Sequence, residues 1–243
     1  MKIVFFGTSH GVPEAHRKCS CTMIEIGESR YFIDMGMHVV EQLTTRNIPI
    51  ESVKAVFVTH MHSDHTQGLI SFADLCSWYF KKTNPIFVLP EPLKENIDCL
   101  GAWLKCNGTE LREFDFRPVN EGSIYQDENI KITAFKTQHT NMSYSFLVEA
   151  EGKRVLFSGD LSVRGPQVDF PVSVFEKPVD LAICESAHFP ATAYLPLFEN
   201  QKNLKRLCFN HYVYNFIPSI LDVKRKLNEI PCYVAEDDME IIL

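Results

Sequence analysis

Short apolar runs separated by Gly, Asp or Asn dominate the chain, a pattern typical of β-strands joined by tight turns. Residues 3–6, 22–26 and 31–33 predict three strands, and residues 27–30 predict a hairpin between the last two. Residues 55–58 (Ala-Val-Phe-Val) predict a strand that is buried on both faces. Further strands are predicted at residues 113–118, 130–135, 143–148, 153–157, 180–184, 204–209, 232–235 and 240–243.

Helical patterns lie between several of these strands. Apolar residues at a spacing of three and four predict a helix over residues 67–82, and a second helix over 93–106 is expected to end at Asn107-Gly108. Shorter helices are predicted at residues 39–46, 193–200 and 218–228. Strands followed by helices indicate an α/β fold, with two sheets packed face to face and helices outside. Since no repeat or linker interrupts the pattern, we expect one domain over residues 1–243.

Composition narrows the class of protein. The chain has 243 residues, of which 45% are hydrophobic and 23% charged, so it is neither collagen-like nor disordered. The formal net charge of -7 argues against a general affinity for nucleic acid, because two negatively charged surfaces repel each other. No apolar stretch approaches the roughly 18 residues of a membrane span, and the apolar run at the amino terminus is too short for a signal peptide.

The eight cysteines are scattered along the chain, with Cys19 and Cys21 the closest pair. This spacing favours buried thiols over a disulfide framework. Two thiols are an incomplete set for a metal ion, so we expect Cys19 and Cys21 to pack inside a strand. A reducing compartment follows from this pattern, and we therefore expect a cytoplasmic protein.

Four side chains that can bind a metal lie within six residues, directly after the predicted strand at 55–58. They are His60, His62, Asp64 and His65 in the segment His-Met-His-Ser-Asp-His. Imidazole and carboxylate groups suit Zn²⁺ and neighbouring divalent ions. Three of the nine histidines fall in this segment, which argues against a polar surface turn. The sequence therefore predicts a metal site at the rim of a sheet.

The motif His-x-His-x-Asp-His at the end of a buried strand resembles the metallo-β-lactamase superfamily, and the later motifs of that family follow in order. His139 comes after the strand at 130–135, Asp160 ends a hydrophobic strand in Ser-Gly-Asp, and His211 follows the strand at 204–209. The resemblance implies a four-layer αββα sandwich. It also implies a pair of divalent metal ions, Zn²⁺, Mn²⁺ or Fe²⁺, held as follows: the first by His60, His62 and His139, the second by Asp64, His65 and His211, with Asp160 bridging both.

This resemblance favours hydrolysis over electron transfer. Related flavodiiron proteins carry a glutamate where this chain has His62, and no flavin-binding domain accompanies the motif. A metal pair with two aspartates and a bridging hydroxide keeps a small positive charge, which suits a monoanionic phosphodiester. Asp64 is expected to orient or deprotonate the attacking water.

Other segments resemble ribonuclease Z and related phosphodiesterases. Residues 7–13 (Gly-Thr-Ser-His-Gly-Val-Pro), with Arg17 after them, resemble the start of that family. Residues 180–189 resemble its strand-plus-acid segment, in which a glutamate supports a histidine that assists the leaving group. These positions correspond to Glu185 and His188. The setting Ser-Ala-His-Phe differs from the family's His-Ser-Thr, so a shift of one or two residues stays open.

The interval from His139 to Asp160 bears on the substrate. Bacterial ribonuclease Z carries a long basic arm there that clamps tRNA, whereas this interval is long enough only for a hairpin. We therefore expect a small phosphodiester such as a cyclic nucleotide. A metal-dependent carboxylic ester, thioester or lactone hydrolase is the alternative; a tRNA 3′-processing endonuclease and a non-catalytic sensing module are less favoured. The resemblance is compatible with a homodimer, and it leaves open whether His10 or Trp78 contacts substrate.

Overall fold

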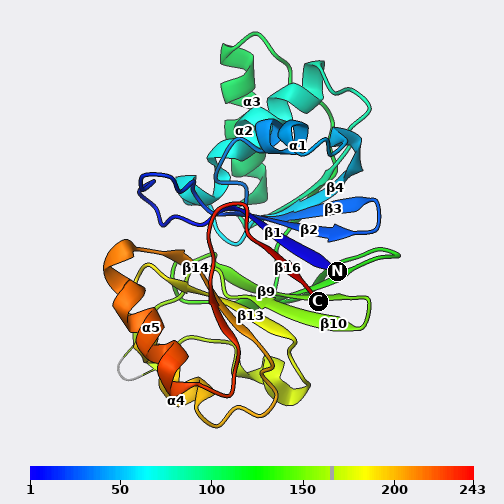
Figure 1. Ribbon diagram of the computed structural model, residues 1–243. Coiled ribbons are helices and arrows are strands. Elements are labelled where there is room, and N and C mark those ends of the chain that lie inside the picture. Colours follow the sequence, from blue (N-terminus) through cyan, green and yellow to red (C-terminus); the bar gives the residue numbers. More distant parts are fainter. Residues whose placement is uncertain (165–166) are drawn as a thin grey trace.

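The computed structural model describes residues 1–164 and 167–243. Two seven-stranded sheets pack face to face, with helices on both outer faces (Figure 1). Helices α1 (Val39–Thr45), α2 (Ser63–Trp78) and α3 (Leu93–Cys106) cover the first sheet. Helices α4 (Leu195–Phe198) and α5 (Ile217–Lys226) cover the second. The predicted αββα sandwich is thereby confirmed.

The first sheet has the strand order β16-β1-β2-β3-β4-β5-β6. Strands β1 to β3 form an antiparallel meander, and β3 to β6 run parallel. The last strand of the chain, β16, pairs antiparallel with the first. The bounds are β1 (Lys2–Gly7), β2 (Cys21–Ile26), β3 (Ser29–Ile33), β4 (Val53–Phe57), β5 (Ile86–Leu89), β6 (Phe116–Pro118) and β16 (Glu240–Ile242).

The second sheet has the order β15-β14-β13-β10-β9-β8-β7. Its strands β7 to β10 form an antiparallel meander, and β10, β13, β14 and β15 run parallel. The bounds are β7 (Gly122–Gln126), β8 (Lys131–Lys136), β9 (Tyr144–Ala150), β10 (Lys153–Phe157), β13 (Leu181–Ser186), β14 (Leu207–Tyr212) and β15 (Cys232–Val234). Strands β11 (Val163–Arg164) and β12 (Gln167–Val168) form a separate pair.

Side chains from both sheets form the central core, in which Phe57 of β4 contacts Phe146 of β9 edge to face, with ring centroids 6.5 Å apart. Separate apolar layers fill the space under the helices: Phe72 of α2 packs on the first sheet, and Ile220 of α5 packs on the second. Full burial of one such side chain stabilises the folded state by about 1.5–3 kcal/mol. Because many side chains are buried in these three layers, the layers together fix how the two sheets face each other. Among the described helices, none is long and apolar enough to cross a membrane.

Most predicted strands and helices are confirmed to within a few residues, but β5, β7 and the short pair β11–β12 have no counterpart among the predicted strands. Strand β5 has only four residues, and β7 contains a glycine and two polar residues, so neither gives a strong apolar pattern. The helix predicted at 67–82 is wrong at both ends, because α2 begins at Ser63 and ends at Trp78. The helix predicted at 193–200 is split into a 3-10 turn at Ala191–Tyr194 and the single turn of α4.

The cysteines follow the sequence-based expectation in part. Cys19 and Cys21 are buried, and Cys21 begins β2. Cys99 and Cys106 are exposed on α3, because the outer face of that helix is solvated. Six of the eight thiols are buried in total.

Asp127 joins the two sheets at the end of the sandwich that carries the β7–β8 turn. Its Oδ2 accepts hydrogen bonds from the hydroxyls of Tyr31 (2.6 Å) in the first sheet and Tyr125 (2.9 Å) in the second. Its Oδ1 accepts the backbone N–H groups of Asn129 (2.8 Å) and Ile130 (2.9 Å). Burial alone would raise the pKa of Asp127, but these hydrogen bonds outweigh it and hold that pKa below its usual value.

We expect Asp127→Asn to lower the free energy of unfolding by about 1–2 kcal/mol, because the amide cannot accept all four donors. The lowered pKa means that the carboxylate stabilises the fold above pH ~4, the usual value for an unfolded aspartate. This contribution is lost as the pH falls through the folded pKa, so the two proteins should converge in acid. Urea unfolding at several pH values measures the difference, with exposed Glu128→Gln as the matched control. A pH-independent difference would contradict the role of the charge.

Candidate metal centre

The candidate metal ligands gather at one edge of the sandwich, where loops leave strands of both sheets. His60 and His62 lie between β4 and α2, and His139 follows β8. Asp160 follows β10, and His211 lies near the end of β14. Parallel strands present their carboxyl ends at the same edge, so residues far apart in sequence converge there.

Two groups of side chains at this edge have the geometry of metal ligands. In each group, one ligand atom from every residue lies within 4.8 Å of the others. The first group is His60, His62, His139 and Asp160, and the second is Asp64, His65 and His211. The fold therefore brings together all seven of the residues predicted as metal ligands.

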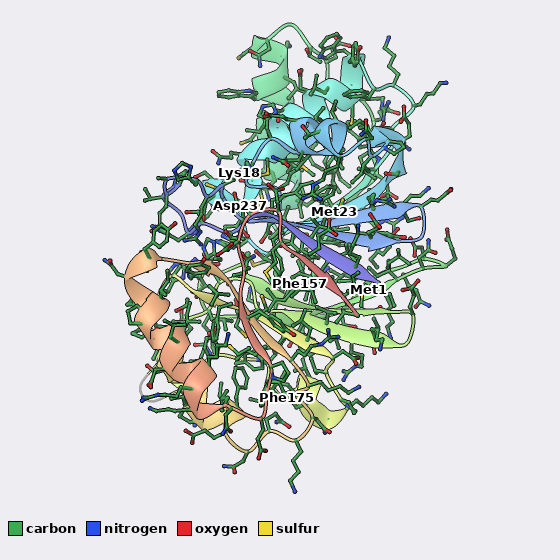
Figure 2. The ribbon with its side chains drawn as sticks, in the orientation of Figure 1. Met1, Lys18, Met23, Phe157, Phe175 and Asp237 are labelled. Carbon is green, nitrogen blue, oxygen red and sulfur yellow. The ribbon has the colours of Figure 1, made fainter. Side chains whose placement is uncertain are left out.

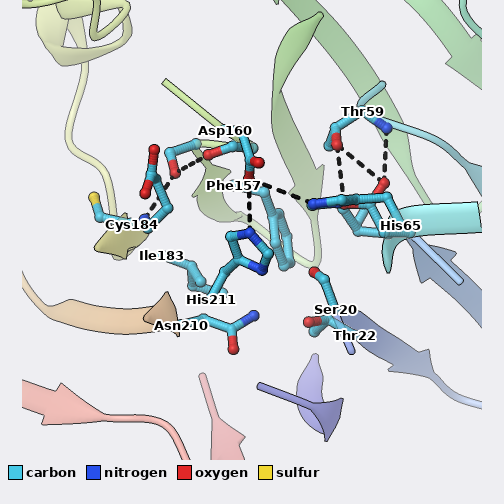
Figure 3. A pocket seen from close by; sticks show the side chains of 15 residues that line it. Ser20, Thr22, Thr59, His65, Phe157, Asp160, Ile183, Cys184, Asn210 and His211 are labelled. Atoms are coloured by element: carbon cyan, nitrogen blue, oxygen red, sulfur yellow. Dashed lines mark hydrogen bonds and ion pairs between the residues drawn. The ribbon is translucent and has the colours of Figure 1, made fainter. Parts of the chain in front are cut away.

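Asp160 faces both groups, with one carboxylate oxygen toward each. Its Oδ2 lies 3.6 Å from Nε2 of both His60 and His139. Its Oδ1 lies 3.5 Å from Nε2 of His65 and 3.3 Å from Nε2 of His211. Figure 3 shows the rings of His65 and His211 turned toward this carboxylate, and all three side chains line a cavity of about 30 Å³.

These separations fit a shared cation better than direct hydrogen bonds. Two donors that are each about 2.1 Å from one tetrahedral ion lie roughly 3.4 Å apart. The buried Nε2 atoms of His60 and His65 and the Oδ1 of Asp160 have no hydrogen-bond partner among the described residues. Since buried polar groups are rarely left without a partner, the orphaned atoms indicate that a divalent ion fits each group.

Burial lowers the pKa of two histidines in the first group, His60 and His139. Desolvation, aided by the nearby His65 ring, lowers the pKa of His60 to about 2, so its imidazole is neutral. Desolvation likewise lowers the pKa of His139, against the opposing charge of Asp160. Neutral imidazole is the form that binds a metal ion.

Carboxylates dominate the second group. Burial opposes a charge on His65, but Asp160 and Asp34 outweigh it and hold the pKa of His65 well above its usual value. Burial would raise the pKa of Asp64, yet the hydrogen bond from His65 and the charges of His65 and His211 hold it low. This half of the site thus attracts positive charge, which a divalent ion supplies as well as a proton does.

Asp34, which sequence analysis missed, orients His65 from behind. Its Oδ2 lies 2.7 Å from Nδ1 of His65, and its Oδ1 accepts the N–H of Thr59 at 2.8 Å. With the proton on Nδ1, the lone pair of Nε2 points into the site.

The signal for Asp34 that was available in the sequence was an apolar strand ending in Asp34-Met35-Gly36. A side chain at Gly36 would collide with the backbone oxygen of Asp64, so only glycine lets the two segments approach so closely.

His188 stands at the rim of the site and is held by Glu185, as the resemblance implied. Oε1 of Glu185 lies 2.9 Å from Nδ1 of His188 and accepts the N–H of Leu161 at 2.9 Å. The other ring nitrogen of His188, Nε2, lies 3.8 Å from Oδ2 of Asp160. Burial would lower the pKa of His188, but the hydrogen bond and charge of Glu185 raise it to about 9.

Two expectations about the motif's surroundings need correction. Asp64 and His65 lie in the first turn of α2, not in a loop before the helix, because α2 begins at Ser63. A negative charge at this position also complements the partial positive charge of the helix N-terminus. His211 lies inside β14 rather than after it, since the strand extends to Tyr212.

The two residues whose contact with substrate was left open lie in different elements. Trp78 ends α2, roughly 21 Å along the helix from Asp64, because each residue rises 1.5 Å. His10 lies in the loop between β1 and β2, where its Nε2 is 3.4 Å from Glu14 Oε1. Cys19 and Cys21 belong to neither ligand group among the described residues.

Comparison with solved structures identifies the fold. The protein YhfI from Bacillus subtilis, described as a metallo-β-lactamase fold protein, superposes with a TM-score of 0.79 at 17% identity, covering 99% of this chain and 98% of that one. The short form of human tRNase Z gives a TM-score of 0.75 at 21% identity, covering 100% and 99%. Yeast PDE1 gives 0.74 at 10% identity, covering 100% and 99%. The chain therefore has the metallo-β-lactamase fold.

Residues 1–178 match the family described as "Anti-Pycsar protein Apyc1", and the chain belongs to this family. The matched part contains His60, His62, His139 and Asp160, whereas His188 lies beyond it.

The resemblance to ribonuclease Z is also confirmed. Ribonuclease Z from Anoxybacillus flavithermus is 29% identical over 171 residues, which cover 68% of this chain and 54% of that protein. Ribonuclease Z from Listeria monocytogenes serotype 4b is 26% identical over 182 residues, covering 73% and 58%. The chain thus spans little more than half the length of these curated relatives.

We expect Asp34→Asn to weaken the retention of metal by 10- to 100-fold, because the hydrogen-bonded partner that orients His65 is altered. Elemental analysis after dialysis against graded chelator concentrations measures retention. Exposed Asp98→Asn, on α3, is the matched control and should behave like the wild-type protein. Unchanged retention in Asp34→Asn would contradict the orienting role.

Proposed function

We propose that the protein is a metal-dependent hydrolase, and more narrowly a phosphodiesterase that acts on a small phosphodiester such as a cyclic nucleotide. In this proposal His60, His62 and His139 hold one divalent ion, and Asp64, His65 and His211 hold another, with Asp160 between them. The ions would be Zn²⁺, Mn²⁺ or Fe²⁺, since nitrogen and carboxylate donors admit all three.

A bound metal pair would polarise the phosphoryl oxygens and lower the pKa of water, the chemistry that two-metal hydrolases use. The protein's own groups then position the reactants. Asp64 directs its Oδ2 into the site, 3.3 Å from Nε2 of His65, where it can orient the attacking water and accept a proton from it.

The position of His188 is the single observation that carries the choice of a phosphodiester. Its Nε2 faces the centre, while Glu185 holds its Nδ1, so a proton on Nε2 can be passed to a leaving group above Asp160. Breaking a P–O bond expels an alkoxide, which needs such a donor. A thioester hydrolase has a better leaving group and needs this histidine less.

The length of the β9–β10 hairpin supports a small substrate. Between His139 and Asp160 the chain forms only β9, a tight turn at Glu151 and Gly152, and β10. Nothing in this interval reaches outward to clamp a large RNA. The net charge of -7 points in the same direction.

The curated relatives favour one competing function. They are named ribonuclease Z, so a tRNA 3′-processing endonuclease is the second candidate, and a homodimer is compatible with either. Carboxylic ester and lactone hydrolysis remain the alternative chemistry, because the same metal pair would serve it.

A substrate panel on the metal-replete full chain tests the proposal. It contains cyclic nucleotides, bis(p-nitrophenyl) phosphate, a precursor tRNA, a thioester and a lactone. We expect turnover of phosphodiesters, fastest for the cyclic nucleotides. Faster cleavage of the tRNA, or turnover of only the thioester or lactone, would overturn the proposed substrate class.

His188→Ala tests the leaving-group role. It should lower the turnover of a cyclic nucleotide by about 10²–10⁴-fold, which is the rate enhancement that a general acid usually contributes. The loss should be much smaller for bis(p-nitrophenyl) phosphate, because p-nitrophenolate leaves without protonation. Exposed His38→Ala is the matched control. Equal losses on both substrates, with metal content unchanged, would contradict the role of His188 as an acid.

A further inference from the structure

The loop of residues 8–18, between β1 and β2, contacts the candidate ligand His211. The backbone oxygen of Ser9 lies 2.9 Å from Nδ1 of His211. Isolated β-bridges also pair Ser9 with Tyr212 on one side and with Cys19 on the other. The loop belongs to the first sheet and His211 to the second, so this contact crosses the sandwich beside the metal centre.

Asp237 closes this loop by binding both of its ends. Its Oδ1 accepts the backbone N–H of Thr8 at 2.9 Å and the hydroxyl of Thr8 at 2.8 Å. Its Oδ2 accepts the backbone N–H of Lys18 at 2.8 Å, and the Lys18 ammonium lies 3.7 Å away. Figure 2 shows Lys18 and Asp237 side by side, where the C-terminal segment before β16 passes the loop. One carboxylate thus fixes the separation of the two ends.

Arg17 strengthens the same arrangement from inside the loop. Its guanidinium is buried, bonds to Thr8 through the hydroxyl (3.2 Å) and the backbone oxygen, and pairs with Glu14 at 2.6 Å. The guanidinium also lies over the ring of Tyr212, 3.7 Å from the ring centre. Tyr212 comes directly after His211 in the chain. The loop is therefore fastened to β14 as well as closed on itself.

His211 needs such support because its backbone is strained. Its φ of +50° lies in the left-handed region, which non-glycine residues adopt only at an energetic cost. A residue keeps such a strained backbone conformation only where contacts with the surrounding structure hold it in place. The Ser9 oxygen supplies one of those contacts and also selects the ring tautomer.

We infer that Asp237 is a positioning residue for the metal-binding half of the centre that contains His211. The closed loop places the Ser9 oxygen, this oxygen holds a proton on Nδ1 of His211, and Nε2 then presents its lone pair to the site. Nε2 lies 3.3 Å from Oδ1 of Asp160 and 3.7 Å from Oδ2 of Asp64. This inference rests on the proposed metal pair, but it assigns a role to a residue that lies outside both ligand groups.

Asp237→Asn tests the inference with little change in shape. The amide keeps one oxygen, but its NH₂ group places a donor opposite the N–H of Lys18 or of Thr8, so the loop can no longer close on both ends. The neighbouring Asp238→Asn is the matched control. Asp238 is exposed, pairs with Arg46 at 2.9 Å and has a left-handed backbone that asparagine also accepts.

Stepwise titration of the metal-free full chain with Mn²⁺, followed by calorimetry, measures each affinity separately. We expect two binding steps in the wild-type protein and in Asp238→Asn. In Asp237→Asn one step should weaken by 10- to 100-fold, the usual effect of losing an outer contact, while the other changes less than two-fold. A merely structural role would weaken both steps equally and would lower the melting temperature of the metal-free protein.

Thr8→Val is a second variant: it removes the hydroxyl that donates to Asp237 and accepts from Arg17, and it keeps the backbone N–H that Asp237 binds. We expect the same single step to weaken, by a smaller factor. Two unchanged steps in both variants, or equal weakening of both steps, would overturn the inference and leave the proposed function standing. A wild-type protein that binds fewer than two ions would overturn both.

Discussion

The carboxylate of Asp160 is the group around which the rest of the structure is arranged. It is almost fully buried, and four imidazole nitrogens lie 3.3–3.6 Å from its two oxygens. An ionised carboxylate in such a place must be compensated by positive charge. Asp160 can therefore stay ionised in this buried place only if cations or protons lie beside it. The two groups of candidate ligands, one facing each carboxylate oxygen, favour cations.

The fold supplies this arrangement through the edge at which both sheets end. Asp160 reaches its position by a turn at Gly159, whose φ is +57° and where a side chain would collide with the backbone oxygen of Tyr144. Outer partners fix the ring orientations of two candidate ligands, Asp34 for His65 and the Ser9 oxygen for His211, and Glu185 does the same for His188 at the rim. Each of these partners belongs to a different segment, so the site is pre-organised by the packing of the whole sandwich.

Much of this site could be predicted from the sequence because its candidate ligands have local signatures. His60, His62, Asp64 and His65 are close in the chain, His139 and Asp160 each follow an apolar strand, and His211 lies near the end of one. Asp34 and Asp237 escaped prediction because their importance depends on long-range contacts, from Asp34 to His65 and from Asp237 to Thr8. The start of α2 was also misplaced, since the histidine-rich segment masks the helical pattern until Leu69. The existence of long elements such as α2 and α3 was predicted, although the ends of α2 were not, and short strands such as β5 were missed.

The central claim is that two metal ions lie close enough to share Asp160, and electron paramagnetic resonance of the Mn²⁺-loaded protein tests it most directly. Ions in two-metal sites are about 3.5–4 Å apart, which couples their spins. The account predicts two Mn²⁺ per chain and an exchange-coupled multiline spectrum. A single ion per chain, or two ions with the six-line spectrum of isolated Mn²⁺, would contradict it.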